Sequence, residues 1–173
     1  MDLTKIKAFA FDVDGVLTNG GILCDLTGEL YRTFDAKDGF ALRMATMNGF
    51  PVAIITGGRS ASIRARVKGC GIPAQDVYLG SRNKIEDLDD FCTKYSITRE
   101  EVLYMGDDIP DAECMAVSGI GACPADATEE AKQVADYISP CPGGRWAVRD
   151  VISMVMKAQG KWNFDVMKYK KLF

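Results

Sequence analysis

Two aspartates one residue apart follow the first apolar run of the chain. Asp12 and Asp14 lie in the stretch AFAFDVDG, and Gly15 comes directly after them. A short apolar run that stops at turn-forming residues is typical of a buried strand in a parallel sheet. Carboxylates just beyond such a strand lie where open α/β sheets place their chemistry. The pair taken alone is equally compatible with a solvated, Asp-rich turn, so its interpretation depends on the rest of the chain.

Residues that can hold or attack a phosphate group also stand just beyond three later strand signals. They are Thr56 and Gly57, then Lys84, then Asp107 and Asp108. In a doubly wound sheet the carboxyl ends of the strands converge on one crevice, so all of these residues are expected to share one site. Several carboxylates together repel each other, and a hard divalent cation such as Mg²⁺ relieves that repulsion. Thr56 and Lys84, beside glycines and a helix start, suit a phosphate, and a free carboxylate can attack phosphorus to form an aspartyl phosphate.

Taken in order, these motifs resemble those of the haloacid dehalogenase superfamily of phosphatases. The D-x-D-G-x motif stands here as Asp12 to Val16, the strand-end Thr as Thr56, the lone Lys at a helix start as Lys84, and G-D-D-x-x-D as residues 106–111. A lone D-x-D pair is weak evidence, whereas all of the motifs in the right order and spacing are strong evidence. The resemblance runs through most of the chain and implies a Mg²⁺-dependent phosphatase.

The resemblance implies a catalytic role for each motif residue. Asp12 is expected to be the nucleophile. Asp14 is expected to protonate the leaving oxygen and then to activate water. Thr56, Gly57 and Lys84 are expected to hold the phosphoryl group as it is transferred to Asp12. Such a reaction is mostly positioning and charge stabilisation, as phosphoryl transfer generally is.

The resemblance also implies a set of metal ligands. Asp12, the backbone carbonyl of Asp14, and Asp107 are expected to bind Mg²⁺. The roles of Asp108 and Asp111 stay open between a metal ligand, a residue behind the ligands, and a support for the motif lysine.

The composition narrows the class of protein. The chain has 173 residues, a net charge of −3 and no histidine. The charge argues against a nucleic-acid-binding module, and the absence of histidine excludes Ser-His-Asp catalysis and H-E-x-x-H zinc sites. The 6 cysteines are scattered without a C-x-x-C pair, so we expect reduced thiols. No apolar run is long enough to span a bilayer, and the N-terminus lacks a signal-peptide pattern, which predicts a cytoplasmic protein with no membrane partner.

Strand and helix signals alternate almost from end to end, without a linker that would divide residues 1–173 into two domains. Strands are expected over residues 8–11, 51–55, 77–79, 102–105, 120–123 and 137–138. Helices are expected over 38–48, 63–70, 85–95, 112–117, 127–134 and 148–155. Capping boxes are expected at Asn83 with Glu86 and at Thr98 with Glu101. The alternation predicts an α/β fold with a doubly wound, mostly parallel, Rossmann-like sheet and helices on both faces.

Residues 21–34 read as a β-hairpin flap rather than a helix. The segments after the first motif and between the second and third motifs have no room for a cap domain. The chain therefore resembles the capless branch of the superfamily, and within it the 3-deoxy-D-manno-octulosonate 8-phosphate (KDO 8-phosphate) phosphatases, through the strings DGVLTNG, FDAKDGFAL and GGRWAVRD. In the last string Trp146 and Asp150 replace the Gly and Glu of the family form.

That family implies a phosphorylated sugar acid as substrate and a role in lipopolysaccharide precursor synthesis. It also implies a homotetramer in which hairpins meet around a central axis and a neighbouring subunit covers each active site. A surface hairpin on a monomer is the alternative. The basic, aromatic tail over 160–173 either reaches a neighbour's site or is a disordered end.

The residues that would recognise the substrate are less well marked. Relatives often have Arg directly after the Gly of the second motif, where this chain has Gly58. The candidates for the sugar-acid carboxylate are Arg59, Arg64, Arg66 and Lys37, each of which is also compatible with a solvated helix charge. Two alternatives stay open: a phosphatase of a nine-carbon 3-deoxy-nonulosonate 9-phosphate, and a catalytically silent module that forms oligomers. A phosphomutase is disfavoured because it would need its aspartyl phosphate shielded from water, usually by a cap.

Overall fold

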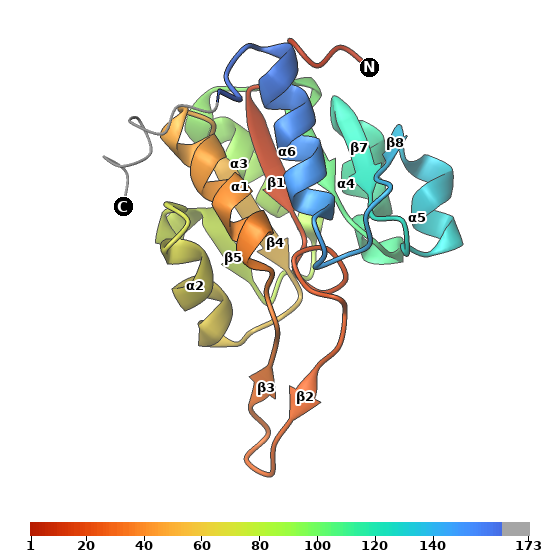
Figure 1. The fold of residues 1–173 in the computed structure, drawn as a ribbon. Coiled ribbons are helices and arrows are strands. Elements are labelled where there is room, and N and C mark those ends of the chain that lie inside the picture. The colour runs from red at the N-terminus through yellow and green to blue at the C-terminus, as the bar shows by residue number, and fades with distance from the viewer. Residues whose placement is uncertain (164–173) are drawn as a thin grey trace.

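A parallel sheet forms the centre of the computed structural model, which describes residues 1–163 (Figure 1). Its 6 strands lie in the order β5-β4-β1-β6-β7-β8, and every neighbouring pair is parallel. The strands are β1 (Ala8–Phe11), β4 (Val52–Thr56), β5 (Val77–Leu79), β6 (Val102–Met105), β7 (Ile120–Cys123) and β8 (Tyr137–Ile138). The order reverses at β1, with β4 on one side and β6 on the other, which creates the switch point where such sheets bind ligands.

Helices cover both faces of this sheet and bury its alternating side chains. Helices α1 (Ala36–Met47), α2 (Ala61–Lys68) and α6 (Ala147–Ala158) contribute to one apolar core, and α3 (Lys84–Tyr95), α4 (Ala112–Val117) and α5 (Glu129–Val134) to the other. In β1, Phe9 and Phe11 enter the first core while Ala8 and Ala10 enter the second. The predicted fold class is therefore confirmed.

Local capping explains where the helices begin. The carboxylate of Asp35 accepts hydrogen bonds from the backbone N–H groups of Lys37 and Asp38, so α1 starts two residues before the predicted position. The predicted capping box at Thr98 and Glu101 is confirmed. The box at Asn83 and Glu86 is wrong, because Asn83 has a backbone conformation (φ −135°, ψ 88°) outside the usual capping region and its side chain caps no N–H group.

The predicted hairpin is present and projects from the body of the protein (Figure 1). Its strands β2 (Leu23–Cys24) and β3 (Leu30–Tyr31) pair antiparallel, and Asp25 organises the turn by accepting hydrogen bonds from Thr27 and Glu29. The exposed large apolar side chains of the hairpin are Ile22, Leu23, Leu26 and Tyr31. In residues 1–163, the segments that flank β4 hold this hairpin, α1, α2, β5 and α3, and no cap domain.

Three further features of the structure concern the cysteines, membrane-spanning helices and the chain end. All six cysteines are free thiols, as expected. Among the described residues, no helix is both long and apolar enough to cross a membrane. The predicted tail lies outside the described residues from position 164 onward.

Candidate active site

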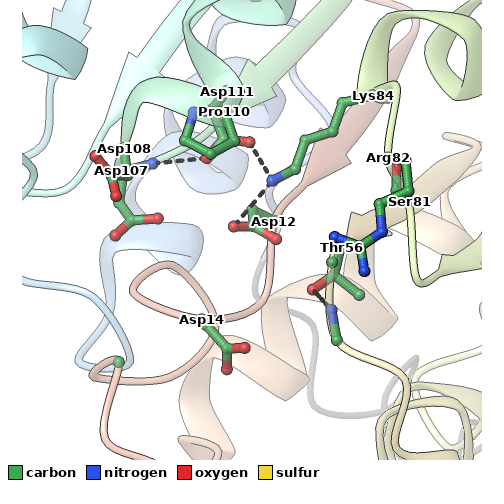
Figure 2. A pocket seen from close by; sticks show the side chains of 13 residues that line it. Asp12, Asp14, Thr56, Ser81, Arg82, Lys84, Asp107, Asp108, Pro110 and Asp111 are labelled. Carbon is green, nitrogen blue, oxygen red and sulfur yellow. Dashed lines mark hydrogen bonds and ion pairs between the residues drawn. The ribbon is translucent and has the colours of Figure 1, made fainter.

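A cavity of about 560 Å³ opens at the carboxyl ends of the central strands (Figure 2). Asp12 follows β1 directly, Thr56 is the last residue of β4, Asp107 stands two residues after β6, and Lys84 is the first residue of α3. The cavity is lined by Asp12, Asp14, Gly20, Thr56, Gly57, Gly58, Ser81, Arg82, Lys84, Asp107, Asp108, Pro110 and Asp111. All the motif residues that the sequence predicted to share one site therefore lie together.

Lys84 joins the aspartates that follow two neighbouring strands. Its Nζ lies 2.7 Å from Asp111 Oδ1 and 3.1 Å from Asp12 Oδ2. All three side chains are buried. Burial by itself would lower the pKa of Lys84, but the charges of Asp12 and Asp111 outweigh it and raise that pKa above its ordinary value. The lysine is therefore held as a fixed cation at the base of the cavity.

Asp111 is held from three sides. Its Oδ1 accepts hydrogen bonds from Lys84 and from the hydroxyl of Tyr104, each at 2.7 Å. Its Oδ2 accepts the backbone N–H of Asp107 at 3.3 Å. Two donors use both lone pairs of Oδ1, and the backbone of Asp107 holds Oδ2, which favours a supporting role for this residue.

Two glycines allow the acidic residues to approach each other. A Cβ atom on Gly106 would lie 2.1 Å from Asp111 Cβ, and one on Gly15 would lie 2.0 Å from Asp107 Oδ2. Gly15 also has a φ of +86°, which side chains other than glycine rarely adopt. The glycine after the D-x-D pair is thus needed both for its backbone conformation and for the position of Asp107.

The acidic group has the properties of a cation site. One oxygen from each of Asp12, Asp107 and Asp111 lies within 4.8 Å of the others. Oδ1 of Asp12 is buried and has no hydrogen-bond partner among the described residues. Burial first, and the neighbouring carboxylates next, raise the pKa of Asp12 to about 6 and that of Asp107 to about 7. An unpaired buried oxygen beside carboxylates that resist ionisation suits a hard divalent cation with oxygen ligands.

The side of the cavity formed by Thr56 and the start of α3 has features of an anion-binding site. Oγ1 of Thr56 accepts the backbone N–H of Gly58 at 3.1 Å, which fixes the hydroxyl at the end of β4. The backbone N–H of Ser81 bonds to the carbonyl of Thr56 at 2.9 Å and so brings the start of α3 to the cavity. Asn83 provides no side-chain cap for the first-turn N–H groups of α3, whose first residue, Lys84, lines the cavity.

Asp14 is held by an arginine from the hairpin. Nε of Arg32 donates to Asp14 Oδ1 at 2.6 Å, and Nη2 donates to Asp14 Oδ2 at 2.9 Å. The side chain of Arg32 is 2% exposed and that of Asp14 is 29% exposed. Asp14 therefore lines the cavity, and its orientation is set by Arg32, which does not line the cavity.

The predicted substrate residues lie outside the cavity of this single chain. Arg59 lies along Gly80, since a Cβ on Gly80 would be 3.1 Å from Arg59 Nε. The guanidinium of Arg66 is near the carbonyl of Asp35.

The other two basic candidates also have partners elsewhere. Arg64 donates to the carbonyl of Val77 at 3.0 Å. Lys37 Nζ lies 4.0 Å from the ring centroid of Trp146, which itself has the left-handed φ of 82° that favours the glycine of the family form.

Asp108 lines the cavity and its Oδ1 accepts the backbone N–H of Ile109.

Sequence reasoning missed several residues of the site. Ser81 and Arg82 line the cavity, and their position just before Asn83 and Lys84 was the available signal. Arg32 had no such signal, because it reaches Asp14 only through the path of the hairpin.

Comparison with known proteins gives a consistent set of relatives. Residues 66–143 match the model of the haloacid dehalogenase-like hydrolase family. The 3-deoxy-D-manno-octulosonate 8-phosphate phosphatase KdsC of Escherichia coli strain K12 is 37% identical over 91% of this chain and 82% of its own length.

Solved structures similar to this chain include phosphatases of the same kind. The Moraxella catarrhalis 3-deoxy-D-manno-octulosonate 8-phosphate phosphatase, in complex with magnesium ion, phosphate ion and KDO, has a TM-score of 0.88 and 34% identity over 92% of this chain and 91% of its own. The cobalt-bound deoxy-D-mannose-octulosonate 8-phosphate phosphatase of Haemophilus influenzae has a TM-score of 0.88 and 32% identity over 92% of each chain.

Proposed function

Since this chain belongs to the haloacid dehalogenase-like hydrolases and is a phosphoric monoester hydrolase, we propose that it is a Mg²⁺-dependent phosphatase that converts KDO 8-phosphate to KDO and phosphate. The observation that carries the proposal is the cavity in which Lys84 is paired with Asp12 while Asp12 Oδ1 has no partner among the described residues. The relative from Moraxella catarrhalis that holds magnesium, phosphate and KDO supports the substrate. The pathway implied is the synthesis of lipopolysaccharide precursors.

In the first step, the carboxylate of Asp12 attacks phosphorus and the bond from phosphorus to the sugar oxygen breaks. Asp14 gives its proton to that oxygen, so the sugar leaves as a neutral alcohol. Lys84, Thr56 and the start of α3 bind the phosphoryl oxygens and stabilise their charge in the transition state. The product of this step is an aspartyl phosphate on Asp12.

In the second step, Asp14 takes a proton from a water molecule whose oxygen attacks phosphorus. The bond between Asp12 and phosphorus breaks, which frees inorganic phosphate and restores the carboxylate. Asp12, Asp107 and the backbone carbonyl of Asp14 would hold Mg²⁺, which when bound offsets the negative charge of the carboxylates and of the phosphoryl group. Asp111 keeps Lys84 and the backbone of Asp107 in place during both steps.

Arg82 suits the carboxylate of the sugar acid. Its exposed side chain lines the cavity, and no hydrogen bond or ion pair engages it within residues 1–163 (Figure 2). A guanidinium can bind a carboxylate through two hydrogen bonds. Arg82 thus takes the recognition role that the family gives to an arginine at the position of Gly58.

The exposed hairpin supports a homotetramer in which a neighbouring subunit covers each active site. Leu23 and Leu26 are 71% and 107% exposed, and Ile22 and Tyr31 add further apolar surface on the same hairpin. Apolar side chains grouped on a projecting hairpin are typical of a surface that a partner covers.

The test is phosphate release from a panel of substrates with Mg²⁺ and with excess chelator. The panel holds the eight-carbon and nine-carbon 3-deoxy sugar-acid phosphates and several ordinary sugar phosphates. Mg²⁺-dependent preference for the eight-carbon acid is the expected result. Preference for the nine-carbon acid would keep the mechanism and change the substrate, whereas no release from any compound would favour a silent oligomer-forming module.

A further inference from the structure

Arg32 lies on the hairpin and binds Asp14, a residue of the candidate active site. It follows β3 on the returning strand of the hairpin, and its guanidinium grips both oxygens of Asp14 at 2.6 and 2.9 Å. A planar guanidinium bound to both oxygens fixes the plane of a carboxylate as well as its position.

The guanidinium acts from behind Asp14 and does not reach the cavity. Arg32 is absent from the cavity lining, and its side chain is only 2% exposed. A Cβ on Gly58 would lie 3.2 Å from Arg32 Nη2 and 3.0 Å from Ile63 Cδ1. The glycine that replaces the arginine of the family pattern therefore leaves room for Arg32.

Figure 2 shows the carboxylate of Asp14 directed away from the pair of Lys84 and Asp12. Without Arg32, Asp14 would be a partly exposed side chain on a loop, free to adopt other rotamers. The hydrogen bonds from Arg32 use one lone pair on each carboxylate oxygen, so each oxygen keeps a lone pair that can hold the proton given to the leaving oxygen or taken from water.

We propose that Arg32 is a positioning residue that orients Asp14 for proton transfer and thereby makes catalysis depend on how the hairpin sits on the body of the protein. The proposal rests on the role of Asp14 in the proposed function. A second contact joins the same hairpin to the body, where Ser60 Oγ donates to Glu29 Oε1 at 2.7 Å on the exposed surface. That contact does not touch Asp14, so a change that preserves it tests a hairpin substitution that leaves the orientation of the carboxylate unchanged.

The experiment compares steady-state kinetics of the full-length holoenzyme with Arg32→Met, Arg32→Gln and Arg32→Lys variants. We expect Arg32→Met and Arg32→Gln to lower kcat at least tenfold and to change KM less than about threefold, because positioned proton transfer contributes roughly 10²–10⁴ in rate and Arg32 does not touch substrate. Arg32→Lys should recover only part of the lost kcat, because it keeps a cation behind Asp14 but cannot bind both carboxylate oxygens in one plane. Glu29→Gln is the matched control: its amide oxygen can still accept from Ser60, so the hairpin stays docked and kcat should stay within twofold of wild type.

Three results would overturn the proposal: wild-type kcat in both neutral variants, a loss carried by KM, or full wild-type kcat in Arg32→Lys. The last result would mean that a positive charge is sufficient and that Arg32 does not act by fixing the plane of the carboxylate. If circular dichroism shows that Arg32→Met does not fold, the kcat of Arg32→Gln alone decides whether loss of the guanidinium lowers the rate. Absence of Mg²⁺-dependent activity in the wild-type protein would instead refute the proposed function, so the two failures are distinguishable.

Discussion

Lys84 Nζ lies 2.7 Å from Asp111 Oδ1, and the two side chains are 8% and 1% exposed. The lysine therefore has a charge partner that is separate from Asp12, the proposed nucleophile. In the proposed mechanism Asp111 balances Lys84 in both steps, so the positive charge stays in place while the charge on Asp12 changes. The fixed pair is an electrostatic support that costs no reorganisation when the phosphoryl group moves.

Replacing Asp111 with Asn should weaken both catalysis and folding. The amide keeps the shape but removes the charge partner of Lys84 and puts an NH₂ group on one of the two accepting atoms. We expect kcat to fall at least tenfold and the free energy of unfolding to fall by about 1–3 kcal/mol. Steady-state kinetics and urea unfolding measure the two effects.

The matched control for that variant is Asp89→Asn on the exposed surface of α3. Asp89 pairs with Arg99 at 2.6 Å, but the two side chains are 48% and 36% exposed. An exposed ion pair contributes less than about 1 kcal/mol, so activity and stability should stay close to wild type. Equal behaviour of the two variants would refute a special role for Asp111.

Replacing Asp12 with Asn should abolish turnover while leaving the fold intact. The amide cannot attack phosphorus, so no aspartyl phosphate forms. Burial already disfavours the ionised form of Asp12, whose pKa is raised to about 6, so loss of its charge should not lower the thermal midpoint appreciably. The measurements are phosphate release and thermal unfolding. Near-normal phosphate release would overturn the assignment of the nucleophile.

Stability of the metal-free protein should fall as pH rises. Burial raises the pKa of Asp12 to about 6 and that of Asp107 to about 7, above the ordinary value of 3.8. A carboxyl with a raised folded pKa favours the folded state most when it is protonated. Its contribution is complete below about pH 4 and is lost as pH rises through 6 and 7.

Addition of Mg²⁺ should reverse that loss. Protons compete with the metal for the same oxygens, so Mg²⁺ should raise the thermal midpoint more at about pH 8 than at about pH 5. The measurement is thermal unfolding at both pH values with chelator and with Mg²⁺, and Asp107→Asn serves as the control that should respond less. An equal Mg²⁺ effect at both pH values would contradict the prediction.

The sequence was sufficient to predict the central sheet and its site residues because both depend on local patterns. The apolar run of β1, buried on both faces of the sheet, and the turn residues after it are visible in a short stretch of sequence. In a parallel sheet such turns place Asp12, Thr56 and Asp107 at one edge. The motif spacing then gave Lys84 its place at the start of α3.

The contacts between segments could not be predicted in this way. Arg32 and Asp14 are 18 positions apart in the sequence, and no periodicity predicts how a hairpin packs on the body of the protein. The predicted capping box at Asn83 is wrong because the loop before α3 is hydrogen-bonded to β4 through the backbone N–H of Ser81. That hydrogen bond constrains the backbone angles of the loop. Arg59 comes one residue after the family's position, and its side chain lies along Gly80 instead of lining the cavity.

Replacing Arg82 with Ala should affect substrate binding rather than chemistry. The guanidinium lines the cavity without a protein partner among the described residues, so its loss leaves no charge unpaired. We expect KM for the sugar-acid phosphate to rise about tenfold with kcat changed less than threefold, since a charged hydrogen bond contributes about 1.5–3 kcal/mol.

The controls use a second arginine and a second substrate. Arg59→Ala should keep KM near wild type, because Arg59 does not line the cavity. Hydrolysis of p-nitrophenyl phosphate, which has no carboxylate, should be equal in wild type and Arg82→Ala. A rise of KM in Arg59→Ala alone would move carboxylate recognition to Arg59.

Replacing Leu26 with Asp should disrupt the proposed tetramer. Leu26 is 107% exposed at the hairpin tip, where a carboxylate would be buried without a partner if a neighbouring subunit covers the tip. We expect light scattering at micromolar concentration to give a tetramer for wild type and smaller species for Leu26→Asp. The control is Val134→Asp on α5, a helix that lies apart from the hairpin in Figure 1. The side chain of Val134 is 37% exposed, and this variant should remain tetrameric. Since the same hairpin carries Arg32, kcat should fall with dissociation, and a monomeric wild-type protein with full activity would refute both the assembly and its link to catalysis.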